Sequence, residues 1–124
     1  MDNNTFFTAT HEWVKFLDDT HAEIGITDYA QHALGDIVFV NLPEIGDALS
    51  ATQRFGDVES VKAVSDLISP VDGVVSAVND ALNDAPETLN SDAMGTWILK
   101  ADNVSKNEGL LTWDAYQQLL AQGH

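Results

Sequence analysis

The sequence predicts a mostly β fold with short helices, and three observations support this prediction. Residues 55–78 contain three or four short runs rich in β-branched residues, separated by turn sequences and without helical periodicity. Residues 12–17 and 22–26 are typical of the two strands of an opening hairpin. The pattern Gly-x-Ile-x-x-Val-Asn at residues 35–41 recurs at residues 73–79 with Val in place of Ile, which indicates two related strand pairs.

Turn and capping signals place the elements between these strands. Thr27 is suited to N-cap a short helix over residues 28–34, and Gly35 is suited to end it. Residues 36–41 are rich in β-branched and aromatic side chains, and they predict a buried strand that ends before Leu42-Pro43.

The last third of the chain predicts loops, one strand and one helix. Residues 80–96 are polar and contain proline and glycine, so we expect loops with at most one helical turn, followed by a last strand over residues 97–100. A final helix begins at Thr112 or Asp114 and runs through Gln122. Its apolar face consists of Trp113, Tyr116, Leu119 and Leu120.

Length and charge limit the classes of function. With 124 residues and a hydrophobic share of 44%, we expect a single folded domain over residues 1–124. A formal net charge of −15 disfavours nucleic acid and membrane partners and favours partner proteins with basic surfaces. Solubility or a salty habitat explains the acidity equally well. The chain has no cysteine, so any redox sulfur must come from a cofactor.

The sequence carries no targeting or membrane signal. No apolar run approaches the roughly 18 residues of a membrane span, and the first residues lack the basic end of a signal peptide. We therefore expect the cytoplasm, with the mitochondrial matrix as the alternative if a presequence has been removed.

Catalytic and metal-binding motifs are missing from the sequence. The four histidines lack the i, i+4 spacing of a helical zinc pair and lack evident partners, and we expect each to be a surface or half-packed residue. The sequence has no G-x-S-x-G elbow, P-loop or G-x-G-x-x-G. We therefore expect neither an enzyme nor a metal protein. The four histidines of the sequence are His11, His21, His32 and His124.

One lysine has an unusual setting. Val61 and Val64 flank Lys62 between two strand-like runs, which predicts an exposed lysine at the tip of a β-hairpin. An enzyme that attaches a group covalently to a lysine needs an amine that is accessible and fixed on a rigid surface. Position alone, however, is weak evidence, because an exposed hairpin lysine usually has no special role.

The segment around this lysine, Glu-Ser-Val-Lys-Ala-Val-Ser-Asp-Leu at residues 59–67, resembles the lipoylation segment of glycine cleavage H proteins. The resemblance extends over roughly residues 6–120, with one departure in the turn before Trp97. Its matching fragments, in order, are His11-Glu12-Trp13, Gly25-Ile26-Thr27, Ala30-Gln31, Leu34-Gly35-Asp36, Val38-Phe39-Val40, Leu42-Pro43, Pro70-Val71, Gly73, Val78-Asn79, Pro86-Glu87, Leu89-Asn90 and Trp97-Ile98.

The resemblance implies a barrel-sandwich hybrid fold, in which two antiparallel sheets face each other and a modified lysine lies on a tight turn. Lys62 would carry lipoate as an amide, on an arm that reaches about 14 Å. The recognition turn around it would consist of Glu59, Ser60, Val61, Ala63 and Asp66. Of these, Glu59 is expected to help lipoylating enzymes recognise the turn.

The resemblance also implies a non-catalytic carrier, monomeric when free. Its arm would accept an aminomethyl group from a pyridoxal-phosphate glycine decarboxylase and pass the carbon unit to a tetrahydrofolate-dependent aminomethyltransferase. An FAD-dependent dihydrolipoamide dehydrogenase would then reoxidise it. The loaded arm would lie in a pocket with polar and acidic side chains at Thr10, Glu12 and Asp66. Alternatively, Glu12 is a solvated strand residue and Asp66 a turn residue.

Three rival interpretations remain at this point. One is a lipoyl or biotinyl domain of another multienzyme complex, although such domains usually carry D-K-A or M-K-M where this chain has Val61-Lys62-Ala63. Another is an H-like intermediate that passes lipoyl groups to other enzymes. The third is an acidic protein-binding module in which Lys62 stays unmodified.

Overall fold

The computed structural model describes residues 4–105 and 109–123, and strands make up most of its regular structure. The strands are β1 (Thr5–Phe7), β2 (Glu12–Phe16), β3 (His21–Ile26), β4 (Ile37–Asn41), β5 (Ala48–Leu49), β6 (Arg54–Ser60), β7 (Val64–Ile68), β8 (Asp72–Val78) and β9 (Leu99–Ser105). The helices are α1 (Asp28–Leu34), α2 (Ala81–Asp84), α3 (Thr88–Ser91), the 3₁₀ helix η1 (Ala93–Gly95) and α4 (Trp113–Ala121).

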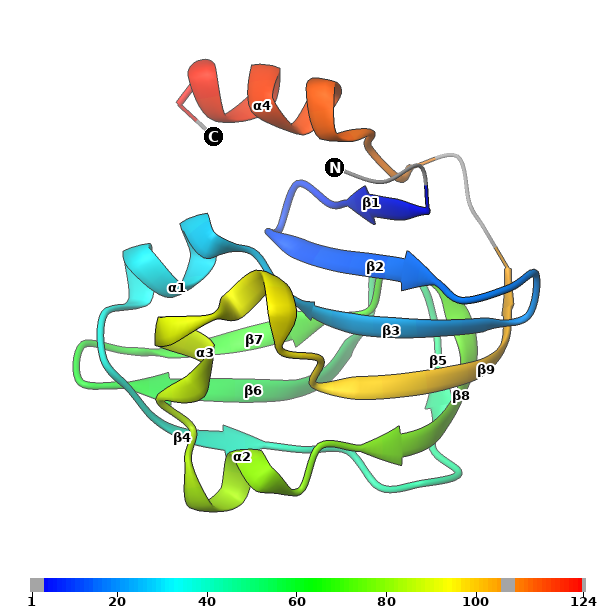
Figure 1. Cartoon of the computed structure of the whole chain (residues 1–124), viewed down its shortest axis with the longest axis horizontal. Helices are drawn as coiled ribbons and strands as arrows, with labels where there is room; N and C mark the ends of the chain where they lie inside the picture. The colour runs from blue at the N-terminus through cyan, green and yellow to red at the C-terminus, as the bar shows by residue number, and fades with distance from the viewer. Residues whose placement is uncertain (1–3, 106–108, 124) are drawn as a thin grey trace.

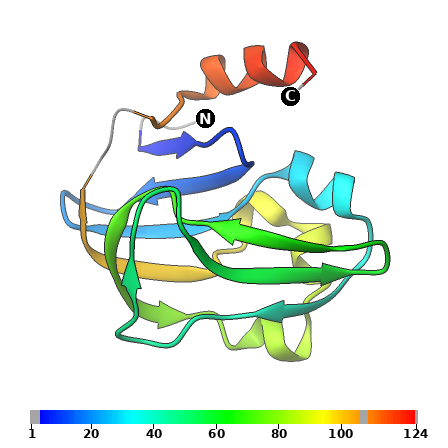
Figure 2. The same ribbon diagram turned by 180° about the vertical axis from the view of Figure 1, so that it is seen from behind.

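The strands form two antiparallel sheets that face each other, as the resemblance implies (Figure 1). The larger sheet has the order β1-β2-β3-β9-β8-β5, and the smaller has the order β4-β6-β7. The described strands pair only within these two sheets, so they do not form one closed barrel. The β6–β7 hairpin projects from one end of the molecule beside the end of α1, which both views show (Figures 1 and 2).

Alternating apolar side chains fill the space between the sheets. In the small sheet, Val40, Val58 and Leu67 are at most 2% exposed and pack in one cluster with Ile98, which precedes β9. A second cluster lies within the larger sheet around Val14, Ile24 and Leu99. Phe55 packs against both clusters and joins them into one interior.

Helix α4 lies over β1 at the edge of the larger sheet (Figure 1). Its residue Tyr116 is 1% exposed and stacks on Phe7 with ring centroids 5.0 Å apart. The Tyr116 hydroxyl lies 2.8 Å from Thr27 Oγ1 and 2.8 Å from His11 Nδ1. Because Thr27 caps α1 through its bond from the Ala30 N–H, this hydroxyl joins both helices to the β1–β2 loop.

Several sequence predictions are confirmed, including the opening hairpin, the helix over residues 28–34 with its Thr27 cap, and a C-terminal helix capped by Thr112. Others were wrong. The strand predicted to be buried over residues 36–41 exposes Val38 and Phe39 by 54% and 43%, because a register irregularity interrupts its pairing with β6. Residues 80–96 form three short helical segments rather than loops, since Leu82, Leu89 and Ala93 anchor them in the core.

The last strand begins later and extends farther than the predicted residues 97–100, because β9 pairs with β3 as far as Asp102 and with β8 as far as Ser105. The short strands β1 and β5 had no sequence prediction. Across the described parts of the chain, no helix combines the length and the apolar character that crossing a membrane requires.

Candidate functional site

Lys62 lies in the three-residue connection between β6 and β7, at the exposed hairpin tip that the sequence predicts. Ser60 closes this connection. Its backbone N–H donates to the Ala63 carbonyl over 2.8 Å, and its Oγ accepts from the Lys62 and Ala63 N–H groups over 3.2 and 3.1 Å. The side chain of Ser60 therefore holds the backbone on which Lys62 stands. We call β6, β7 and residues 61–63 the Lys62 hairpin.

A second contact fixes the tip to the rest of the fold. The Val61 N–H donates to the Asp36 carbonyl over 3.0 Å, which ties the tip to the loop between α1 and β4. Asn90 in α3 holds that loop, since its side chain donates to the Gly35 carbonyl and accepts from the Ile37 N–H, each over 2.8 Å. Asn90 had no predicted role, because no local sequence pattern marks its side chain as a contact to this loop.

The aliphatic stem of Lys62 lies over Gly35. A Cβ built on Gly35 would lie 3.2 Å from Lys62 Cε and 3.7 Å from Nζ, and the glycine has a positive φ of 77°. Glycine thus meets two requirements here, the left-handed backbone that ends α1 and the space beneath the lysine. No ion pair within residues 4–105 and 109–123 involves Lys62.

The other basic residues have different settings. Lys15 lies within β2, where it is paired with Thr5 on one side and Glu23 on the other. The Nζ of Lys100 lies 3.7 Å from Glu23 Oε2 and 4.9 Å from the centre of the Trp97 ring. Lys106 lies outside the described residues. Among the described lysines, Lys62 alone occupies a hairpin tip.

The outer face of the small sheet carries an acidic row behind the tip. Strand register places Asn41, Asp57 and Asp66 opposite one another, so their side chains share a face. Arg54 binds both carboxylates, with Nε 3.0 Å from Asp66 Oδ1 and Nη2 in contact with Asp57. Asn41 donates to Asp57 and, over 3.4 Å, to Glu59.

Glu12 occupies a different environment, at the start of β2. It is 2% exposed, and its carboxylate accepts from the hydroxyls of Thr8 (2.7 Å) and Thr10 and from the Ile68 N–H (3.3 Å). Burial raises the pKa of Glu12, and these hydrogen bonds act in the opposite direction. We call Thr8, Thr10, Glu12 and Ile68 the Glu12 pocket.

A cavity of about 420 Å³ adjoins this pocket, and the three partners of Glu12 form part of its lining. The structure thus brings together two of the predicted pocket residues, Thr10 and Glu12. It places the third, Asp66, on the outer face of the small sheet against Arg54. Thr8 and Ile68 were missed by the sequence analysis, although a threonine four residues before a buried glutamate is compatible with such a contact.

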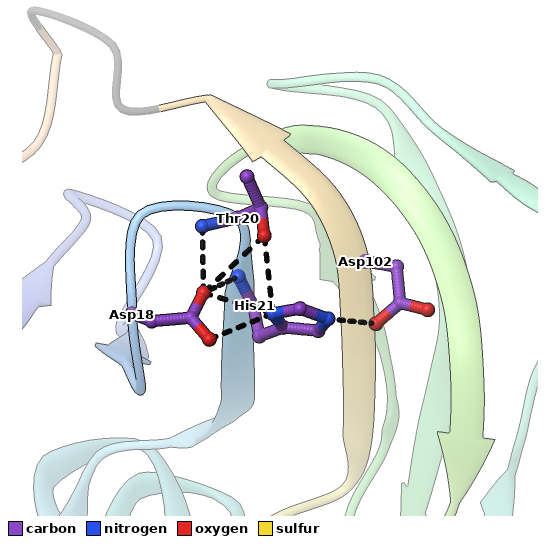
Figure 3. Close-up of polar contacts among 4 residues, drawn as sticks. All are labelled: Asp18, Thr20, His21 and Asp102. Carbon is purple, nitrogen blue, oxygen red and sulfur yellow. Dashed lines mark hydrogen bonds and ion pairs between the residues drawn. The ribbon is translucent and has the colours of Figure 1, made fainter.

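The histidines have more partners than the sequence predicted. His11 contacts Tyr116, and the two ring nitrogens of His21 lie 2.8 Å from Asp18 and 3.4 Å from Asp102 (Figure 3). The Thr20 N–H and the His21 ring lower the pKa of Asp18 to about 2, and Asp18 in turn raises the pKa of His21. The described residues contain no group of His, Asp or Glu arranged to hold a metal ion.

Comparison with known proteins decides the family. The family model described as glycine cleavage H-protein matches residues 5–123. The chain belongs to the glycine cleavage H-protein family. The H protein of Lachnoclostridium phytofermentans is 48% identical over 117 residues, which cover 94% of this chain and 92% of that protein. That of Alkaliphilus oremlandii is 52% identical over 114 residues, covering 90% and 89%.

A solved structure agrees with this assignment. The crystal structure of a glycine cleavage system H protein from Mycobacterium marinum superposes with a TM-score of 0.86 at 38% identity, covering 99% of this chain and 98% of that one. H proteins carry lipoate on a lysine, and membership in the family makes this chain a lipoyl carrier component of glycine cleavage. The comparisons favour this role over lipoyl relay to other enzymes and over an unmodified acidic module.

Proposed function

We propose that Lys62 is the residue that carries lipoate and that the chain catalyses nothing itself. The observation that carries this proposal is the position of Lys62, exposed at a hairpin tip that Ser60 and Asp36 hold in place. The chemistry of Lys62 fits as well, since its primary amine forms no ion pair with a residue that the structure describes and is available to form an amide. In the bound form, lipoate supplies reversible thiol–disulfide chemistry that this cysteine-free chain lacks.

One acidic residue behind the tip, Asp66, has the spacing and charge that the loaded arm requires. Asp66 lies four residues from Lys62, which is at most about 13 Å of extended chain, and the arm reaches about 14 Å. Ile68, the β7 residue of the Glu12 pocket, is two residues farther along, about 20 Å on the same scale and beyond the arm. We infer that Asp66 stabilises the protonated amine of the aminomethyl group, while Arg54 offsets part of the acidic charge. Thr10 and Glu12 of the Glu12 pocket are assigned no contact with the amine in this proposal.

The residues next to Lys62 serve recognition in this proposal. Glu59 and Ser60 on one side, and Val61 and Ala63 at the tip, present the lysine to lipoylating enzymes. The partners of the finished carrier are glycine decarboxylase, the aminomethyltransferase and dihydrolipoamide dehydrogenase. The charge of −15 steers the chain toward basic surfaces on these enzymes. We place this single-domain monomer in the cytoplasm.

Reconstituted glycine cleavage tests the proposal. Lipoylated wild type and a Lys62→Arg variant, prepared under the same conditions, are mixed with glycine decarboxylase, aminomethyltransferase, dihydrolipoamide dehydrogenase, tetrahydrofolate and NAD. We expect glycine-dependent NADH formation with wild type and none with the variant, while a Lys15→Arg control matches wild type. Equal rates for the Lys62→Arg variant and wild type would contradict the assignment.

A further inference from the structure

Exposed apolar side chains gather around Lys62. Of the eight large hydrophobic residues that stand exposed in the described part of the chain, four belong to this end of the molecule. They are Val38 (54% exposed), Phe39 (43%), Val61 (66%) and Val64 (64%). We call these four residues the Lys62 collar. Single exposed hydrophobic residues need no explanation, whereas a group around one functional residue does.

Strand register places two collar residues, Phe39 and Val64, on one face of the small sheet. Phe39 pairs with Glu59, and Glu59 pairs with Val64, so these three side chains form a row on the outer face of the small sheet. Val61 adjoins Lys62 in the tip. The next row along the same strands is the acidic one that contains Asp57 and Asp66. The surface therefore combines an apolar rim with negative charge behind it.

Folding does not require the collar to be apolar. The interior contacts of the same strands come from Ile37, Val40, Val58 and Leu67, each at most 3% exposed. Polar side chains at Phe39 and Val64 would satisfy the pattern of a sheet with one solvated face. The apolar character of the collar thus calls for a partner that covers it.

We propose that the Lys62 collar is the docking surface for the enzyme that attaches lipoate. This inference rests on the proposed role of Lys62. A bare lysine side chain extends only about 6 Å from its Cα, so an enzyme that acylates its amine must contact the hairpin around it. The finished arm, more than twice as long, lets later enzymes act at a distance. The surface of the attaching enzyme that contacts the collar is therefore apolar, and it carries basic groups that face Glu59 and Asp66.

Lipoylation kinetics test this proposal. The substrates are apo wild type and a Phe39→Thr/Val64→Thr double variant, which keeps β-branched residues in the strands. The matched control is Leu17→Thr/Ile45→Thr, since Leu17 and Ile45 are 50% and 67% exposed but lie outside the Lys62 hairpin and β4. A lipoate–protein ligase supplied with lipoate and ATP modifies each protein, and intact mass gives the rate.

We expect kcat/KM to fall roughly tenfold for the collar variant, mainly through KM, and to stay within about twofold for the control. Equal urea midpoints show that folding is unaffected. If the collar variant is destabilised, Val61→Thr replaces it, because Val61 lies outside the strand pairing. An unchanged kcat/KM overturns the inference, as does a defect seen only in loading by glycine decarboxylase. Unmodified wild type would instead overturn the proposed function.

Discussion

At the Lys62 hairpin the side chains around Lys62 are exposed, whereas at the Glu12 pocket a carboxylate is only 2% exposed and accepts three hydrogen bonds. The hairpin is held through its backbone, by Ser60 and by the Asp36 carbonyl. The pocket is held through the Glu12 side chain, which reaches the Ile68 N–H of β7 from the start of β2 and accepts from Thr8 and Thr10 of the β1–β2 loop. Access to the lysine and rigidity of the fold thus reside in separate regions, and substitutions in each should have different effects.

The Glu12 pocket should give the largest stability effect. Replacing Glu12 with Ala leaves the hydroxyls of Thr8 and Thr10 and the Ile68 N–H without their acceptor in a buried setting. We expect the free energy of unfolding at pH 7 to fall by about 2–3 kcal/mol, measured by urea denaturation. A loss below about 0.5 kcal/mol would show that the pocket is not a stabilising unit.

The Tyr116 hydroxyl connects α4 to Thr27 and to His11 of the β1–β2 loop. Its removal should lower the stability by less than the loss of Glu12. A Tyr116→Phe substitution keeps the stacking on Phe7 but removes the contacts with Thr27 and His11. We expect a loss of about 1–2 kcal/mol in urea denaturation, because the two partners stay in place. A Tyr29→Phe substitution, at a residue that is 44% exposed, serves as the matched control and should be neutral. Equal losses for the two would refute the role of the Tyr116 hydroxyl.

Ser60 should show the opposite behaviour, a modest cost in stability with a clear cost in lipoylation. A Ser60→Ala substitution removes the acceptor of the Lys62 and Ala63 N–H groups. We expect about 0.5–1 kcal/mol in stability and a several-fold slower lipoylation, which Ser60→Thr should restore because it keeps the hydroxyl. A Ser60→Ala variant that is lipoylated at the wild-type rate would contradict the role of Ser60 in positioning Lys62.

The smallest expected effect is a change in pH dependence at Glu12. Because burial raises its folded pKa above the ordinary value of 4.5, the folded state binds the proton more tightly than the unfolded state does. The stability from this linkage is fully present below pH 4.5 and is lost as pH rises through the folded pKa. Relative to a Glu12→Gln variant, wild type should therefore gain stability as pH falls from 7 to 4.5. A flat difference in urea unfolding would contradict the burial argument.

Local patterns were sufficient to predict most of the regular structure. Thr27 and Gly35 define α1 because capping is a local interaction, and the Lys62 tip follows from two flanking β-rich runs. The strand over residues 36–41 was correctly placed, but its burial was wrong, since exposure of Val38 and Phe39 depends on a register irregularity with β6. The helical segments in residues 80–96 depend on tertiary burial of Leu82 and Leu89, which no local propensity encodes.

Only part of the candidate site could be predicted. Lys62 has a sequence signature, whereas Thr8, Ile68 and Asn90 act through contacts between segments distant in sequence or in a folded loop. The salt bridge of Asp66 with Arg54 likewise depends on the pairing of β6 with β7. Side chains that support a site from other elements are the ones that sequence patterns fail to show.

Intact mass spectrometry tests the central claim most directly. Wild type, Lys62→Arg and Lys15→Arg are expressed in lipoate-supplemented cells with an active lipoylating enzyme. We predict a lipoyl-sized mass increment on wild type and on the Lys15→Arg control, and none on Lys62→Arg. An increment that persists in the Lys62→Arg variant, or an unmodified wild type, would contradict the assignment of the arm to the exposed hairpin.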